Sequence, residues 1–215
     1  MRFYGYASTM FSLFRDSWAH RVLIWRLSRR EVEARFRGSF LGLFWAVILP
    51  LMMLGVFSLV FGSMFGSRWV RPGDHAGIGD YSYPIVLFSG LIIFGVISEP
   101  INRAPRLVLE NVAYVKKVVF PLEVLPFVAV INALITASVS FVVFLAVLVF
   151  NYGLPPATIL ALPIVLLPLS LMTLGIVYFF ASLGVFLRDL LHVTGPLTTA
   201  IMFLSPLLYP LESLP

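Results

Sequence analysis

The sequence contains no cysteine and few charged residues of either sign. The missing cysteines exclude disulfides, thiolate metal sites and cysteine nucleophiles. Charged residues make up 12% of the 215 residues and apolar residues 60%, whereas soluble globular chains carry roughly 25% and 45–50%. In water, such a chain would expose large apolar patches. We therefore expect its apolar surface to face lipid or a partner chain.

The long apolar runs also lack the groups that most membrane chemistry needs. They carry no ionisable residue, and the nearest one is Glu99, at the inner end of the second run. Ion-coupled transporters usually carry such residues in mid-membrane despite a cost of about 2.5–3.5 kcal/mol each. No GxxxxGK[ST] phosphate loop occurs, the acidic residues are scattered, and the three histidines show no metal-ligand spacing. We predict no catalytic or metal site and no internal energy source, so another polypeptide must drive any uphill transport.

Charge-free stretches predict an all-α integral membrane protein. A helix needs about 20 residues to cross a hydrocarbon layer of ~30 Å. Residues 1–215 then form a single transmembrane domain, with a cytoplasmic interface region at 1–37 and a membrane-spanning region at 38–215. Gly and Pro residues divide the longest apolar stretch and mark the start of the last one. The five predicted spans are roughly Leu41–Phe65, Tyr83–Ile101, Val124–Phe150, Leu160–Leu187 and Val193–Leu211.

The distribution of basic residues predicts a cytoplasmic N-terminus. Eight of the fifteen Lys and Arg residues precede Gly38. With the five spans, thirteen basic residues fall on the inner side and two on the outer side, and such asymmetry orients membrane chains. Orientation alone is a sufficient account of these charges. Contact with anionic lipid or an anionic substrate head group remains a second interpretation.

Two segments fit neither a span nor a simple loop. In Phe11–Arg37, the residues Trp18, Val22 and Trp25 share one helical stripe, which predicts an amphipathic helix along the inner membrane surface, while periodicity alone fits an ordinary juxtamembrane anchor equally well. Asn102–Pro121 predicts a short cytoplasmic helix between the second and third spans. Its apolar face suits a partner protein or rests on the bilayer, and the pattern leaves both open.

Three sequence blocks resemble those of a known family. They are Arg35–Trp45 followed by Pro50; Asn111–Pro126, with Tyr114-Val115-Lys116-Lys117 inside it; and Phe186–Leu190 followed by Ser205–Pro210 and Leu214–Pro215. In this order and spacing, the sequence resembles the membrane subunits of type-2 ABC exporters. The resemblance is to the branch that exports polysaccharides such as O-antigen, capsule and teichoic acid.

The resemblance implies a function, a location and partners. The chain would be the channel-forming permease of an ATP-driven exporter in the bacterial cytoplasmic (inner) membrane, moving a lipid-linked polysaccharide. It would pair with a second copy of itself and with two copies of an ATP-binding subunit, which would hold ATP and Mg. This chain would bind membrane lipid, no cofactor and no nucleic acid. The family has six spans, so we expect a chain that stops at Pro215 to be truncated before the last one.

The resemblance also implies site residues. The segment between the second and third spans and the turn before the fifth would contact the ATPase: Arg106, Leu107, Glu110, Asn111, Tyr114, Lys116, Lys117, Arg188 and Asp189. Four arginines before the first span, here called the arginine collar, would meet a pyrophosphate head group: Arg29, Arg30, Arg35 and Arg37. Channel aromatics on which sugars slide would include Phe57, Phe61, Tyr178 and Phe179.

Two other functions remain open. One is a permease of the same architecture with another cargo, such as a drug or a lipid. The other is an intramembrane enzyme of lipid-linked sugar assembly, which the lack of intramembrane carboxylates disfavours.

Overall fold

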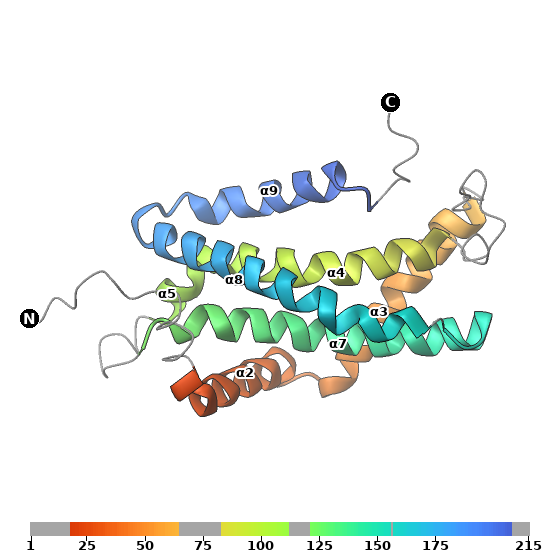
Figure 1. Cartoon of the computed structure of the whole chain (residues 1–215), viewed down its shortest axis with the longest axis horizontal. Helices are drawn as coiled ribbons and strands as arrows, with labels where there is room; N and C mark the ends of the chain where they lie inside the picture. The colour runs from red at the N-terminus through yellow and green to blue at the C-terminus, as the bar shows by residue number, and fades with distance from the viewer. Residues whose placement is uncertain (1–17, 65–82, 112–120, 156, 208–215) are drawn as a thin grey trace, which may run out of the picture.

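The computed structural model describes residues 18–64, 83–111, 121–155 and 157–207, and it contains only helices and their connections in those ranges (Figure 1). In chain order the elements are α2 (Arg21–Phe36), η1 (Gly42–Phe44), α3 (Trp45–Phe57), η2 (Ser58–Met64), α4 (Tyr83–Arg103), η3 (Ala104–Arg106), α5 (Leu107–Glu110), α7 (Val124–Tyr152), η4 (Ala157–Ala161), α8 (Leu162–Phe186) and α9 (Leu190–Leu204). The predicted all-helical class is confirmed.

Three of these helical stretches are long and apolar enough to cross a membrane: Tyr83–Glu110, Val124–Tyr152 and Ala157–Phe186. They run side by side, with α9 along one side and α3 near the end at which α4 begins (Figure 1). Trp45–Phe61 and Leu190–Leu204 are shorter apolar helices. All five lie where charge-free runs predicted spans, because such runs leave the hydrogen-bonded helix as the only stable backbone in lipid.

The start of the fifth helix differs from its prediction. We expected Gly195 and Pro196 to mark the start near Val193, but α9 begins at Leu190 and contains Pro196. Proline removes one backbone donor without always ending a membrane helix, since nearby hydroxyls can satisfy freed carbonyls. Pro196 frees the carbonyl oxygen of His192, one turn earlier, and the helix continues past this position to Leu204.

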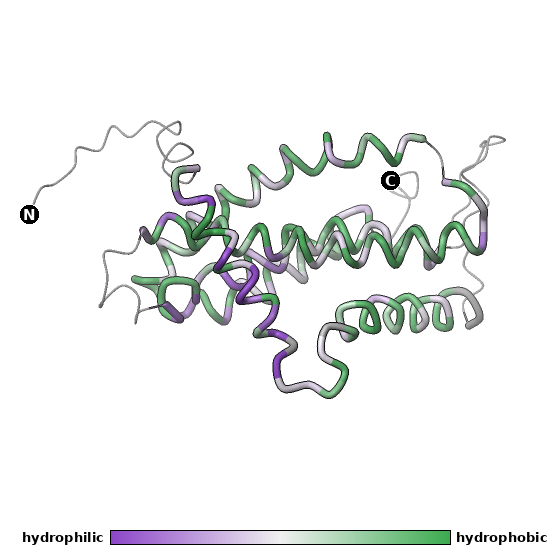
Figure 2. Tube along the Cα trace, turned by 90° about the horizontal axis from the view of Figure 1, so that it is seen from below, coloured by the Kyte–Doolittle hydropathy of each residue, from purple (hydrophilic) through white to green (hydrophobic). Residues whose placement is uncertain are grey.

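Helix α2 has two distinct faces. Ile24 is buried and joins Val124 and Val128 of α7 in a small apolar cluster. The apolar stripe predicted to lie on the membrane surface is exposed: Trp18 by 72%, Val22 by 55% and Trp25 by 60%. Hydrophilic residues are concentrated along α2 (Figure 2). A helix packed on the bundle through one stripe and exposing tryptophans on another suits a membrane interface.

The segment after α4 packs against its own chain. Ala104 and Leu107 are 0% and 2% exposed, in a cluster with Leu125 of α7 and Val177 of α8. A Cβ atom on Gly184 of α8 would lie 2.6 Å from the Cα atom of Pro105, so glycine permits this close contact. We expected this apolar face to meet a partner protein or the bilayer, and that prediction is wrong for Leu107 and Pro105. The described helix ends at Glu110, while 112–120 lie outside the described residues.

Candidate functional site at the inner end of the bundle

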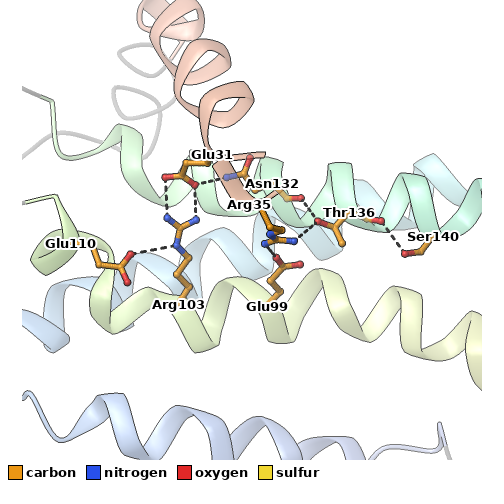
Figure 3. Close-up of polar contacts among 8 residues, drawn as sticks. All are labelled: Glu31, Arg35, Glu99, Arg103, Glu110, Asn132, Thr136 and Ser140. Atoms are coloured by element: carbon orange, nitrogen blue, oxygen red, sulfur yellow. Dashed lines mark hydrogen bonds and ion pairs between the residues drawn. The ribbon is translucent and has the colours of Figure 1, made fainter. Parts of the chain in front are cut away.

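The main polar site joins α2 to α4 through two ion pairs. Arg103 donates to both carboxylate oxygens of Glu31, at 2.5 and 3.0 Å. One turn later in α2 and one turn earlier in α4, Arg35 pairs with Glu99. Each helix thus carries a Glu and an Arg four residues apart, and the two sets pair in opposite order (Figure 3). We call these two contacts the ion-pair ladder.

Residues of α5 and α7 extend the ladder. The Asn132 amide donates to Glu31 at 2.5 Å, and Arg35 donates to the Thr136 hydroxyl at 3.2 Å. The Arg103 Nε atom lies 3.7 Å from a carboxylate oxygen of Glu110, in α5 (Figure 3). The Glu31 and Arg103 side chains are 20% and 30% exposed, so solvent screens their pairing less than it screens a surface pair. Four elements therefore meet at one set of charges.

A groove of about 780 Å³ runs from this polar end between α2, α3, α4 and α7. Glu31, Arg35, Glu99 and Arg103 line one part of it together with Asn132 and Thr136. The rest of its wall is largely apolar and includes Leu49, Pro50, Met53, Phe57, Phe88, Leu91 and Ile92. A groove with one charged part and long apolar walls is suited to an amphipathic ligand.

The arginine collar is not one uniform cluster. Arg35 is held by Glu99 and Thr136, and Arg29 pairs with Glu33 at 2.8 Å on the exposed side of α2. Arg37 is exposed at the C-terminal cap, where the backbone turns to an extended conformation. Arg30 is also exposed on α2. Of the four, the structure places only Arg35 in the groove lining.

The predicted ATPase contacts divide into exposed and buried residues. Arg106, Glu110, Arg188 and Asp189 are exposed, and the contacts of α5 with α8 place these two regions at the same end of the bundle (Figure 1). Asn111 donates to the Leu107 carbonyl oxygen at 2.8 Å and so closes α5. Leu107 is buried and supports the segment from within. The remaining three predicted contacts lie outside the described residues: Tyr114, Lys116 and Lys117.

The four predicted channel aromatics lie in two separate places. Phe57 and Phe61 are neighbours, with ring centroids 6.2 Å apart, and Phe57 lines the groove. Tyr178 packs edge-to-face on Phe127, and its hydroxyl donates to the Glu123 carbonyl oxygen at 2.5 Å. Phe179 is 62% exposed. Tyr178 thus links α8 to the start of α7. The contacts of Phe57, Phe61 and Phe179 do not test whether they line a channel for sugars.

Sequence reasoning missed the ion-pair ladder, although a signal was present. Glu31 and Arg35, and likewise Glu99 and Arg103, are spaced by four residues and therefore share a helix face. Complementary faces on two helices near the same membrane surface could have suggested pairing. In the described part of the chain, no group of three or more His, Asp or Glu residues is placed to hold a metal ion.

Comparison with known proteins decides the family. The model of the ABC-2 type transporter family matches residues 22–215. The chain belongs to the ABC-2 type transporter family. An O-antigen export system permease (RfbA) of Myxococcus xanthus is 31% identical, covering 95% of this chain and 75% of the relative. The polysialic acid transport protein KpsM of Escherichia coli is 26% identical, covering 91% and 72%. A Klebsiella pneumoniae O-antigen export system permease is 25% identical, covering 88% and 69%.

Family membership identifies the long apolar helices as membrane spans. The ABC-2 permease is an integral membrane protein, and its long apolar helices are its membrane-spanning part. It is a transport subunit and not an enzyme, and it works with a separate ATP-binding subunit. The predicted recognition of this family from three sequence blocks is confirmed.

Proposed function

We propose that this ABC-2 permease forms the channel of an ATP-driven exporter that moves a lipid-linked polysaccharide across the bacterial cytoplasmic membrane. The observation that carries the proposal is the match of almost the whole chain to relatives named as permeases for O-antigen and polysialic acid. The absence of ionisable residues from the apolar runs supports it, since a channel driven by a separate ATPase needs no ion-coupling site.

The assembly that we propose contains two copies of this chain and two ATP-binding subunits. ATP and Mg belong to those subunits. Arg106, Glu110, Arg188 and Asp189 would face them, since all four are exposed at one end of the bundle. Asn111 would support this surface by closing α5, and Tyr114, Lys116 and Lys117 remain proposed contacts on sequence grounds.

The groove suggests where the lipid anchor of the polymer lies. Its apolar walls fit a hydrocarbon chain, and Arg35 in its charged part fits the phosphates of a head group, because guanidinium groups bind phosphate oxygens in pairs. In this arrangement Glu99 competes for Arg35. We therefore assign first contact with the head group to Arg37, at the C-terminal cap of α2, with Arg29 and Arg30 about two turns earlier on the helix as further contacts.

Deletion of the gene in its own bacterium tests the proposed function. We expect the cell surface to lose one polysaccharide while lipid-linked polymer accumulates in the cytoplasm, and the restored gene should reverse both effects. Polymer that disappears from both places would indicate an enzyme of assembly. Unchanged surface polysaccharide would indicate another cargo.

A further inference from the structure

The Glu31–Arg103 contact is built more firmly than an ordinary surface pair. Glu31 accepts two hydrogen bonds from Arg103 and a third from Asn132, whose side chain lies in the bundle. Asn132 itself is only 4% exposed. By contrast, Arg29 and Glu33, on the same helix, form a single contact with side chains 71% and 48% exposed. Exposed pairs of that kind contribute little.

Arg103 stands between the interface helix and the segment that faces the ATPase. It is the last residue of α4, directly before η3 and α5. Its guanidinium group reaches Glu31 of α2 and, more loosely, Glu110 of α5 (Figure 3). The tight approach of Gly184 to Pro105 holds η3 against α8. A displacement of α5 would therefore reach Arg103, and through it Glu31 of α2, both along η3 and through the Glu110 contact.

Where α2 packs on α7, one buried donor and one buried acceptor make no hydrogen bond. Within the described residues, the buried Ser28 hydroxyl of α2 and the Asn132 carbonyl oxygen of α7 have no hydrogen-bond partner. Ser28 is 0% exposed, so bulk water does not compensate it. Leaving a buried polar atom unpaired is costly. The Ser28 hydroxyl can donate and the Asn132 side-chain oxygen can accept. A different packing position of α2 on α7 could therefore form hydrogen bonds that are absent here.

We propose that Glu31 and Arg103 are positioning residues that transmit movement of the ATPase-facing segment to the interface helix α2. In this role, Arg103 carries α2 along when ATP binding displaces α5, and α2 moves against α7 at the charged part of the groove. The proposal rests on the proposed function for the meaning of that movement, since α2 carries the arginine collar. The movement itself is independent of the exported substrate.

The first experiment breaks and restores the contact. Glu31→Gln and Arg103→Gln should each lower export by about tenfold, a typical size for coupling between sites, while abundance and ATPase binding stay at the wild-type level. The double exchange Glu31→Arg with Arg103→Glu keeps both charges on the same membrane side and should recover most of the export. The matched control is Glu33→Gln, which removes an exposed contact on the same helix and should export normally.

The second experiment needs no export. The sequence has no cysteine, so two introduced cysteines can carry one spin label each. One label is placed at Arg26, exposed on α2, and the other at Val142, 65% exposed on α7. In the complete transporter, ATP should change the distance between the labels in the wild type and in the double exchange, but not in either single variant. A nucleotide-independent distance in the wild type, or an unchanged response in the single variants, would overturn the proposal. If the single variants do not accumulate, a double exchange that accumulates without a response would overturn it as well.

The two proposals fail differently. A wild-type transporter that shows the distance change but moves no polysaccharide contradicts the proposed function alone. A transporter that exports polysaccharide while the distance responds equally in all variants contradicts the role of Glu31 and Arg103 alone.

Discussion

Arg37 is exposed like the other collar arginines, but it lies at the C-terminal cap, where α2 ends and the chain turns toward α3. Arg35, two residues earlier, is engaged by Glu99. A phosphate group approaching along the inner membrane surface would therefore find Arg37 before it could displace Glu99. The planar fork of arginine matters for such contact, whereas lysine offers only a point charge.

This difference gives a prediction for single substitutions. Arg37→Lys should lower export by about tenfold, equivalent to ~1.4 kcal/mol, because lysine cannot bind two phosphate oxygens in the same planar way. Membrane orientation should not change, since lysine and arginine count equally for it. Export assays in cells measure the effect, and Arg26→Lys on the exposed side of α2 is the control. Normal export by Arg37→Lys would leave the collar as an orienting charge only.

At the scale of elements, the contact of η3 with α8 holds α5, the segment that we propose to face the ATPase, in place. Gly184 faces the backbone of Pro105, which cannot move aside as a flexible side chain could. Even a methyl group at position 184 must push the two elements apart. Gly175 lies in the same helix, and its missing Cβ would meet no heavy atom within 4 Å.

The pair of glycines gives a matched prediction. Gly184→Ala should destabilise the protein by about 1–3 kcal/mol, the usual cost of overpacking, and should weaken binding of the ATP-binding subunit because α5 is displaced. Gly175→Ala should be neutral or slightly stabilising, since alanine favours a helix. Thermal unfolding and co-purification in detergent measure both effects. Equal behaviour of the two variants would show that the close contact does not position α5.

The helices themselves could be predicted from the sequence, because charge-free runs of about 20 residues have one stable conformation in lipid. The boundary of α9 could not, since Pro196 is tolerated inside it. The burial of Leu107 was also missed: an apolar residue between two spans can face a partner, the bilayer or its own chain, and only packing decides. The ion-pair ladder required knowing that α2 lies beside α4, which periodicity within one helix does not reveal.

At the scale of the whole molecule, charge and apolar surface are separated along the bundle. The ion-pair ladder, α5 and the connection between α8 and α9 lie at one end, and the long helices carry apolar residues that are largely exposed (Figures 1 and 2). Lipid and neighbouring subunits can cover such a surface, while the charged end is the one that we propose for the ATP-binding subunits. This division of surfaces matches a permease that has no energy source of its own.

Reconstitution tests this account most directly. The protein as its gene encodes it, together with its ATP-binding subunit, would be placed in liposomes that hold lipid-linked polysaccharide in the leaflet facing the ATP-binding subunits. We predict that ATP makes the polymer accessible to a membrane-impermeant glycosidase added to the opposite side, and that a hydrolysis-deficient ATP-binding subunit abolishes this. ATP hydrolysis at a normal rate with all polymer still protected would contradict the account.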